Sequence, residues 1–181
     1  EALAAPEVPQ RLVDRLERMY ASNPNRYLNL AHYDYLGLSR HPRVLAAAHD
    51  AIDTMGSGAG ASRLVGGERS THQALEKDLA QFFGHGDVLA MISGYLTNVS
   101  LIMHLLSPRD LVLIDELAHN SIVLGAKGGR FECKTFRHND LDHLDAQLNE
   151  YRDQYRHVLL VAEGLYSMDG DIPDLPELVA I

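Results

Sequence analysis

The feature that most constrains this sequence is a series of short strand-like runs separated by segments of helical periodicity. The runs cover residues 88–92, 111–114, 132–136 and 157–162. The last of them shows no alternation of apolar and polar residues, which indicates a strand buried on both faces. Short strands that alternate with helices predict an α/β fold, with a mostly parallel sheet and flanking helices.

The helices of this alternating part are expected at 70–83, 95–106, 119–128 and from Asn139 or Asp140 to about residue 155. Asn and Asp are favoured at a helix start because their side-chain oxygens accept hydrogen bonds from free backbone amides. The regular alternation therefore extends over most of the second half of the chain.

The first part of the chain has a different pattern. It predicts a helix from Pro9 to Ala21, a short extended piece at 27–30, and a second helix at 42–55 that begins with a proline. The stretch Gly56–Ala61 is too rich in glycine for a helix interior. We therefore expect a helical N-terminal segment at residues 1–55 and the first part of an α/β domain at residues 56–181.

Composition narrows the class of protein. The chain has 16 Lys and Arg against 25 Asp and Glu, for a formal net charge of -9, which argues against a nucleic-acid-binding protein. The single Cys133 can form no internal disulfide bond. No apolar run reaches the roughly 18 residues of a membrane span, and the N-terminus lacks the pattern of a signal peptide. A cytoplasmic location is the expectation.

Ligands of parallel sheets bind at the carboxyl ends of the strands, so the residues that follow each run are the candidates. Ser93, Gly94 and Tyr95 follow the first run and open a helix. Free amides and the positive end of a helix dipole form an anion site there. A plain tight turn is the alternative. His119 follows the second run, where an imidazole could stack on a flat ring or move a proton; a capping or packing role is the alternative.

The last run is followed by a polar stretch that contains Glu163 and Ser167. Ser167 could donate a hydrogen bond to a ligand oxygen, and Glu163 could orient it. The alternative is a solvated loop. Asp169-Gly170-Asp171 resembles part of a calcium loop, but the spaced acids and the terminal Glu of an EF-hand are missing.

Other motifs favour no site. Gly56–Ala61 fits a dinucleotide fingerprint in spacing, but a helix precedes it where the fingerprint requires a strand. His72 and Glu76 lie one helical turn apart with no third metal ligand in sight. His138 and His143 lie at an acidic helix start and are interpreted as surface capping residues.

Seven motifs in order resemble one family, the α-oxoamine synthases, which are pyridoxal-phosphate-dependent acyltransferases of fold type I. They are DYLGLSRHPRV (34–44), GSGAGASRLVGG (56–67), HQALEKDLAQFFG (72–84), ISGYLTN (92–98), DELAHNSI (115–122), FRHNDLDHL (136–144) and EGLYSMDGDIPDLPELV (163–179). The resemblance implies part of the family's large cofactor-binding domain, preceded by the helical segment. It also implies an enzyme that condenses an amino acid with an acyl thioester, usually with decarboxylation.

The resemblance also assigns roles to residues. It implies that Gly94 and Tyr95 hold the phosphate of pyridoxal 5′-phosphate and that His119 stacks on the pyridine ring and contacts the substrate. Ser167 matches a serine that contacts the cofactor. Ser62 matches a position associated with substrate choice, in a loop that often reaches the active site across a dimer. A homodimer with shared sites is thus implied, with an acyl group supplied on coenzyme A or a carrier protein.

The sequence departs from the family pattern at two points. Tyr33 stands where the family usually has the asparagine that binds the amino-acid carboxylate, so the amino acid is not readable from the sequence. The lysine that forms the Schiff base with the cofactor lies beyond the matched motifs in the family and is absent here. Lys77, Lys127 and Lys134 are not in its motif.

Three interpretations remain open at this point. The first is an acyltransferase whose later catalytic residues lie outside this sequence. The second is a non-catalytic partner subunit or inactive fragment of such a synthase. The third is another fold type I activity, such as a lyase or an aminotransferase.

Overall fold

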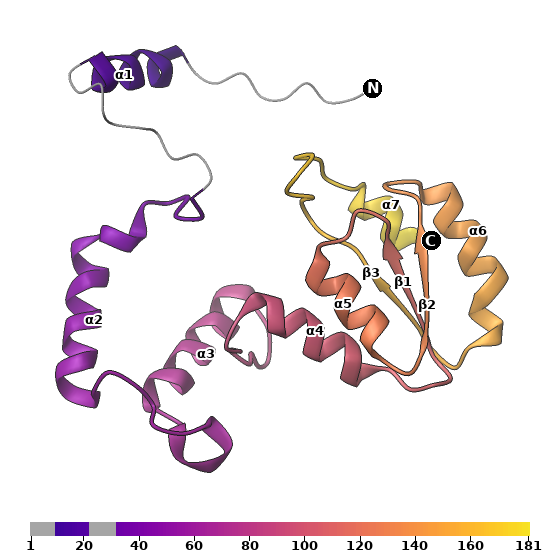
Figure 1. Cartoon of the computed structure of the whole chain (residues 1–181), viewed down its shortest axis with the longest axis horizontal. Coiled ribbons are helices and arrows are strands. Elements are labelled where there is room, and N and C mark those ends of the chain that lie inside the picture. Colours follow the sequence, from indigo (N-terminus) through magenta and orange to yellow (C-terminus); the bar gives the residue numbers. More distant parts are fainter. Residues whose placement is uncertain (1–9, 22–31) are drawn as a thin grey trace. The chain divides into compact units, whose positions relative to one another are not determined.

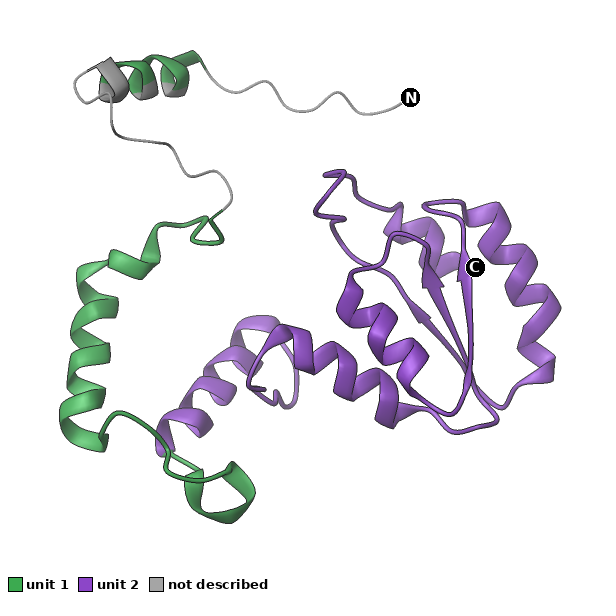
Figure 2. Ribbon diagram, viewed as in Figure 1, with its two compact units in different colours: residues 1–69 green, residues 70–181 purple. Residues whose placement is uncertain are grey.

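The structure, a computed structural model, describes residues 10–21 and 32–181 (Figure 1). The chain forms two compact units, Glu1–Arg69 and Ser70–Ile181 (Figure 2). The sequence predicts a domain boundary between residues 55 and 56, and this position lies inside the first unit. That boundary stays a prediction. The extended piece expected at 27–30 lies outside the described residues.

The first unit contains the two helices that the sequence predicts, α1 (Gln10–Ala21) and α2 (Pro42–Met55). It also contains two short helical turns that the sequence did not predict, η1 (Leu38–Arg40) and the single wide turn η2 (Arg63–Gly67). The side chain of His41 caps α2 by accepting from the amide of Arg43 at 3.3 Å. Gly56, with a φ of 83°, ends α2 in a conformation that favours glycine.

From Leu111 onward, the second unit alternates strands and helices as predicted. Its elements are α3 (Ser70–Phe83), α4 (Gly94–Leu105), β1 (Leu111–Asp115), α5 (Asn120–Gly128), β2 (Glu132–Phe136), α6 (Leu141–Tyr151), η3 (Arg152–Gln154), β3 (Val158–Val161) and α7 (Leu175–Ala180). Asp140 caps α6 by accepting from the amide of His143 at 2.8 Å. Among the described residues, no helix combines the length and the apolar character that crossing a membrane requires.

One predicted strand is wrong. Residues 88–92 form no strand in the structure. The amide of Ala90 donates to the Glu76 carboxylate at 2.7 Å instead of to a neighbouring strand, and the side chain of Ile92 is 89% exposed. An apolar run becomes a strand only where another strand takes up its backbone groups. The predicted helix at 140–155 is also shorter, because α6 gives way to a 3₁₀ turn after Tyr151.

The sheet has the order β2-β1-β3, and both pairings are parallel. The central strand β1 is buried along its whole length. Val112 and Ile114 pack on one face with residues of α4 and α5, whereas Leu111 and Leu113 pack on the other with residues of α6 and α7. Each face of β1 is therefore covered, as is typical of a central strand in a parallel sheet. The run at 157–162, which the sequence predicts to be buried on both faces, forms β3 at the end of the strand order, and the residues of β3 are only partly buried. That prediction is wrong because, among the described residues, β3 has a neighbouring strand on one side alone.

The path of the chain creates a crevice at one edge of the sheet. The chain passes from β1 through α5 to β2 on one side, and then returns through α6 to β3 on the other side of β1. Right-handed crossovers in opposite directions place α5 and α6 on opposite faces (Figure 1). The loops that leave β1 and β3 consequently diverge, which is the switch point where open α/β sheets bind ligands.

The α4–α5 contact gives a prediction for stability. A Cβ atom added at Gly125 would lie 3.1 Å from the backbone oxygen of Asn98 and 3.1 Å from Cα of Val99. Overpacking against a backbone costs about 1–3 kcal/mol, and the helix propensity of alanine offsets about 1 kcal/mol of it. We expect Gly125→Ala to lower the free energy of unfolding, measured by urea denaturation, by about 1 kcal/mol.

Gly128→Ala is the matched control, because the atoms nearest to its added Cβ belong to the flexible side chain of Met103 and not to the backbone. Since that side chain is free to move away, we expect Gly128→Ala to be neutral or stabilising. Equal effects of the two substitutions would contradict the close α4–α5 packing.

Candidate active site

The N-terminus of α4 has the geometry of an anion site. Ser93 is its N-cap residue: the hydroxyl accepts from the amide of Leu96 at 3.1 Å, and the carbonyl accepts from the amide of Thr97 at 2.9 Å. The amides of Gly94 and Tyr95 belong to the first turn, where no carbonyl of the helix is available to them. An added Cβ at Gly94 would meet no atom within 4 Å, so the approach to these amides is open.

His119 is the N-cap residue of α5, so the capping interpretation of this histidine is confirmed. Its Nδ1 atom accepts from the amide of Ser121 at 3.2 Å and lies 2.7 Å from the hydroxyl oxygen of Ser121. That hydroxyl is fully buried and accepts from the side-chain amide of Asn98 at 3.0 Å. A nitrogen that accepts a backbone N–H carries no proton, so the neutral ring of His119 carries its proton on Nε2.

The helix starts of α4 and α5 are connected through Tyr95. Its phenol oxygen accepts from the side chain of Asn120 at 2.9 Å. The rings of Tyr95 and His119 lie edge to face, with centroids 6.1 Å apart. The structure thus brings the predicted phosphate-binding residues and the predicted stacking histidine into one place.

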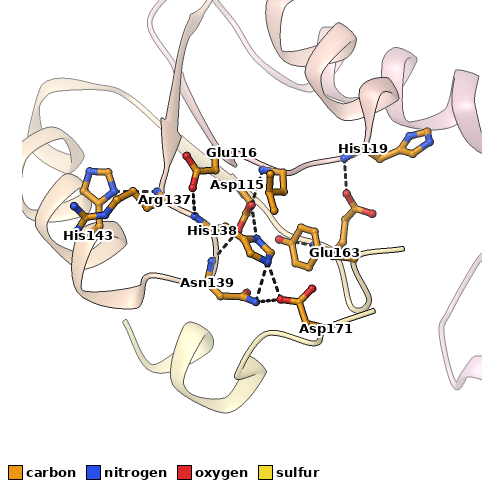
Figure 3. Close-up of polar contacts among 11 residues, drawn as sticks. Asp115, Glu116, His119, Arg137, His138, Asn139, His143, Glu163 and Asp171 are labelled. Carbon is orange, nitrogen blue, oxygen red and sulfur yellow. Dashed lines mark hydrogen bonds and ion pairs between the residues drawn. The ribbon is translucent and has the colours of Figure 1, made fainter. Parts of the chain in front are cut away.

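The loop after β3 lies against the same histidine. The backbone amide of His119 donates to the carboxylate of Glu163 (Figure 3). Residues 117–120 and residues 163 and 166–169 line a shared cavity of about 200 Å³, with His119, Glu163 and Ser167 among them. This cavity lies at the divergence of the loops that leave β1 and β3. It is smaller than the roughly 300–1,000 Å³ of whole ligand pockets, so it encloses only part of a ligand.

A second polar cluster lies beside this cavity, and the sequence did not predict it. His138 contacts the carboxylates of both Asp115 and Asp171, at 2.8 Å and 2.7 Å. The interpretation of His138 as a surface capping residue is therefore wrong, because its ring is mostly buried between two acidic groups. His143 does lie at the helix start, where its Nδ1 accepts from the amide of Arg137 at 2.9 Å.

Two predicted site residues, Tyr33 and Ser62, belong to the first unit. Tyr33 is 87% exposed. The carbonyl of Ser62 accepts from three amides of the η2 turn, those of Val65, Gly66 and Gly67. The other six predicted residues, Ser93, Gly94, Tyr95, His119, Glu163 and Ser167, all belong to the second unit. The roles of Tyr33 and Ser62 stay predictions.

Within the described residues, no group of three or more His, Cys, Asp or Glu side chains could hold a metal ion. His72 and Glu76 are the pair considered from the sequence as metal ligands. The carboxylate of Glu76 accepts a hydrogen bond from the backbone amide of Ala90. The glycine-rich stretch Gly56–Ala61 follows α2 rather than a strand, which agrees with the rejection of a dinucleotide fingerprint.

The arrangement fits a flat aromatic ring that carries a phosphate. First-turn amides of α4 suit the phosphate, the ring of His119 offers an aromatic face, and the hydroxyl of Ser167 lines the adjoining cavity. Pyridoxal 5′-phosphate has this chemistry. The residues present therefore fit the cofactor that the motifs imply.

Comparison with known proteins identifies relatives over nearly the whole chain. Residues 25–181 match the family Aminotransferase class I and II. The 8-amino-7-oxononanoate synthase of Thermoanaerobacter pseudethanolicus is 36% identical over 179 residues, which cover 99% of this chain and 43% of the relative. A putative 8-amino-7-oxononanoate synthase of Caulobacter sp. is 45% identical over 156 residues, or 86% of this chain and 41% of the relative.

Solved structures agree with these relatives. The serine palmitoyltransferase of S. paucimobilis has a TM-score of 0.79 and 36% identity, over 82% of this chain and 37% of that chain. The serine palmitoyltransferase of Sphingomonas wittichii has a TM-score of 0.79 and 31% identity, over 97% of this chain and 50% of that chain. These solved structures confirm the predicted α/β fold with a parallel sheet. This chain spans about two fifths of the length of the curated relatives that it matches.

Proposed function

This chain belongs to the class I and II aminotransferase family, and on that premise we propose that it forms the N-terminal part of a pyridoxal-phosphate-dependent α-oxoamine synthase. Such an enzyme condenses an amino acid with an acyl thioester of coenzyme A or a carrier protein, usually with decarboxylation. The observation that carries the proposal is the convergence of the α4 N-terminus, the ring of His119 and the loop of Ser167 at the carboxyl edge of the sheet.

Each part of this convergence has a task. The first-turn amides of Gly94 and Tyr95 hold the phosphate, and the positive end of α4 stabilises its charge. Ser167 donates a hydrogen bond to an oxygen of the ligand. Glu163 holds the backbone of His119 in place through the amide contact. When it is bound, the cofactor supplies an electron sink for the amino-acid substrate.

His119 has two tasks in this proposal. Its ring face packs on the cofactor and limits the ring's movement. The Ser121 contacts keep Nδ1 unprotonated, so Nε2–H remains as a donor. A donor of this kind stabilises negative charge that develops on a substrate carbonyl oxygen.

The phosphate site gives the test of cofactor binding. We expect Gly94→Glu to lower the affinity of the chain for pyridoxal 5′-phosphate by at least about tenfold, because a carboxylate would occupy the anion site. The fold should persist, since the space around Gly94 is open and an acidic residue in the first turn stabilises a helix. Isothermal titration calorimetry with the cofactor measures the affinity, and circular dichroism checks the fold.

Gly86→Glu is the matched control, because Gly86 also has open space around its Cβ position and the charge change is the same. Its affinity for the cofactor should equal that of the unchanged chain. A similar loss in both variants would indicate a general effect of charge, and the phosphate site at α4 would be refuted.

A condensation assay separates the three interpretations of the sequence. We expect the whole protein that contains this chain and a cofactor lysine to release thiol from an acyl-coenzyme A only when an amino acid is present. A thioester-independent reaction of the amino acid would instead indicate a lyase or an aminotransferase. A whole protein that binds no cofactor and gives no product would indicate a non-catalytic partner subunit.

The assembly and the location are further parts of the proposal. We place the enzyme in the cytoplasm as a homodimer, in which the loop of Ser62 reaches the site of the second copy and Tyr33 shapes the amino-acid pocket. Leu64 is 100% exposed and Val65 is 85% exposed, and apolar side chains next to Ser62 gain stability when another surface covers them. Light scattering of the whole protein measures the dimer.

A further inference from the structure

The three loops that leave the sheet at its carboxyl edge meet at one side chain, His138. It follows β2, and its ring contacts Asp115 at the end of β1 and Asp171 in the loop after β3 (Figure 3). The neighbouring Asn139 repeats the connection: its amide donates to Asp115 at 3.2 Å and its side chain donates to Asp171 at 2.7 Å. Residues 23 and 33 positions away in the sequence are thus joined through one imidazole.

The chemistry of this contact favours the protonated ring. Nδ1 of His138 lies 2.8 Å from one carboxylate and Nε2 lies 2.7 Å from the other. A carboxylate accepts hydrogen bonds and donates none, so both nitrogens must carry protons to satisfy both contacts. A neutral imidazole has one N–H and would leave the other nitrogen facing a carboxylate oxygen.

The charged groups around His138 are mostly acidic. Glu116 accepts the backbone amide of His138 at 2.9 Å. A cavity that His138 helps to line also has four acidic residues in its lining, Asp140, Asp142, Asp174 and Glu177. Arg137 is the basic neighbour, and its guanidinium pairs with Asp140 at 2.7 Å. The surroundings as a whole therefore favour the imidazolium.

Tyr166 closes the remaining side. Its ring lies edge to face on His138, with centroids 4.6 Å apart. Burial raises the pKa of Tyr166 to about 12, and the charge of Asp115 adds to this. The phenol therefore stays neutral at any pH at which the imidazole titrates.

The contacts of His138 with Asp115 and Asp171, here called the His138 bridge, also determine the shape of the loop that carries Ser167. The amide of Tyr166 donates to the carbonyl of Asp171 at 2.9 Å, and the amide of Gly170 donates to the carbonyl of Tyr166 at 2.7 Å. These bonds close residues 166–171 into a turn whose end is held by His138. Asp115, at the other end of the His138 bridge, begins the loop that leads to His119.

We propose that His138, as an imidazolium between Asp115 and Asp171, is a positioning residue that holds the loop of Glu163 and Ser167 against the loop of His119, and that loss of its proton loosens the loop. The inference rests on the proposed function only for the ligand that the loop binds. The contacts that hold the loop in place lie within this chain and need no cofactor.

The direction of the pH effect follows from linkage. Burial lowers the pKa of His138, but the contacts with Asp115 and Asp171 outweigh it and raise the pKa above its ordinary value of 6.5. A raised pKa means that the contribution to stability is fully present below 6.5 and is lost as the pH rises through the raised value. A pKa that is higher by one in the closed loop than in the open loop corresponds to about a tenfold change in the opening equilibrium.

Amide hydrogen exchange of the 181-residue chain tests this inference. We expect the protection of the Tyr166 and Gly170 amides, relative to the Leu113 amide in β1, to fall at least about tenfold as the pH rises through the titration of His138. The imidazole titration itself is read from the His138 ring signals by NMR. In His138→Gln the protection should be low at both ends of the range and should no longer follow this titration.

His157→Gln is the matched control. His157 also contacts a buried aspartate, Asp110 at 3.2 Å, but at the opposite end of the sheet. This variant should keep the pH profile of the unchanged chain. Two results would overturn the proposal. One is exchange protection of the loop in the unchanged chain that does not follow the His138 titration, and the other is a pH profile that persists in His138→Gln. If His138→Gln does not fold, the result for the unchanged chain alone decides the proposal.

Cofactor affinity tests whether the loop serves the proposed site. At about pH 6, below the raised pKa of His138, we expect His138→Gln to bind pyridoxal 5′-phosphate with lower affinity than the unchanged chain. This difference in affinity should become smaller at higher pH, where His138 of the unchanged chain has lost its proton. If the chain binds no cofactor while the exchange profile follows His138, the proposed function fails and the positioning role stands. If the cofactor binds and the profile is flat, the positioning role fails and the proposed function stands.

Discussion

Asp115→Ala is expected to lower the free energy of unfolding by about 3–5 kcal/mol, the loss typical of breaking a buried charged contact. The side chain of Asp115 is 1% exposed and accepts from the amide of Leu117 at 2.8 Å as well as from Asn139 and His138. Alanine would leave two backbone amides and Nδ1–H of His138 without an acceptor beside a position that water barely reaches. Urea denaturation followed by circular dichroism measures the loss.

Two further variants make this prediction specific. Asp115→Asn keeps one acceptor oxygen and should lose less stability than Asp115→Ala. Glu132→Gln changes an exposed carboxylate that lies 3.7 Å from Lys134, and such surface changes usually stay within about 0.5 kcal/mol.

A double-mutant cycle tests whether Asp115 acts through the imidazole. Asp115→Asn combined with His138→Gln should cost less than the sum of the two single substitutions, because both remove the same contact. Additive losses, or a loss below about 1 kcal/mol for Asp115→Ala, would show that the cluster is well hydrated.

The fold was predictable to the extent that periodicity determines it. The run Leu111–Ile114 lacks alternation because α5 and α6 cover both faces of β1, and residues 132–136 were predicted with the observed bounds. Residues 88–92 show where periodicity is insufficient. An apolar run predicts that a segment is buried. It does not identify the neighbouring strand whose backbone groups would pair with it.

The grouping of the candidate residues was predictable where chain order and chemistry coincide. His119, Glu163 and Ser167 were candidates because they follow strands, and the structure brings them to one cavity. His138 also follows a strand, β2, so the same rule applied to that strand would have indicated it. Its role as a bridge could not be read from the sequence, because Asp115 and Asp171 lie far from it along the chain.

The largest functional effect is expected at His119 in the whole, lysine-containing protein. His119→Ala should lower kcat/KM for condensation by about 10²–10³-fold, the range for loss of one hydrogen-bond donor to a developing oxyanion. It should also weaken binding of pyridoxal 5′-phosphate, because the aromatic face is lost. Steady-state release of thiol from an acyl-coenzyme A measures the first effect, and cofactor titration measures the second.

His119→Phe separates the two tasks of the ring. Phenylalanine keeps an aromatic face but has no Nε2–H, so cofactor affinity should stay within a few-fold of the unchanged protein while kcat falls nearly as far as in His119→Ala. His104→Phe is the control, because His104 is an exposed residue of α4 whose Nδ1 contacts the Ser100 carbonyl of its own helix. Full turnover in His119→Phe would mean that the ring only stacks, and that the Ser121 contacts which keep Nδ1 unprotonated serve the helix start alone.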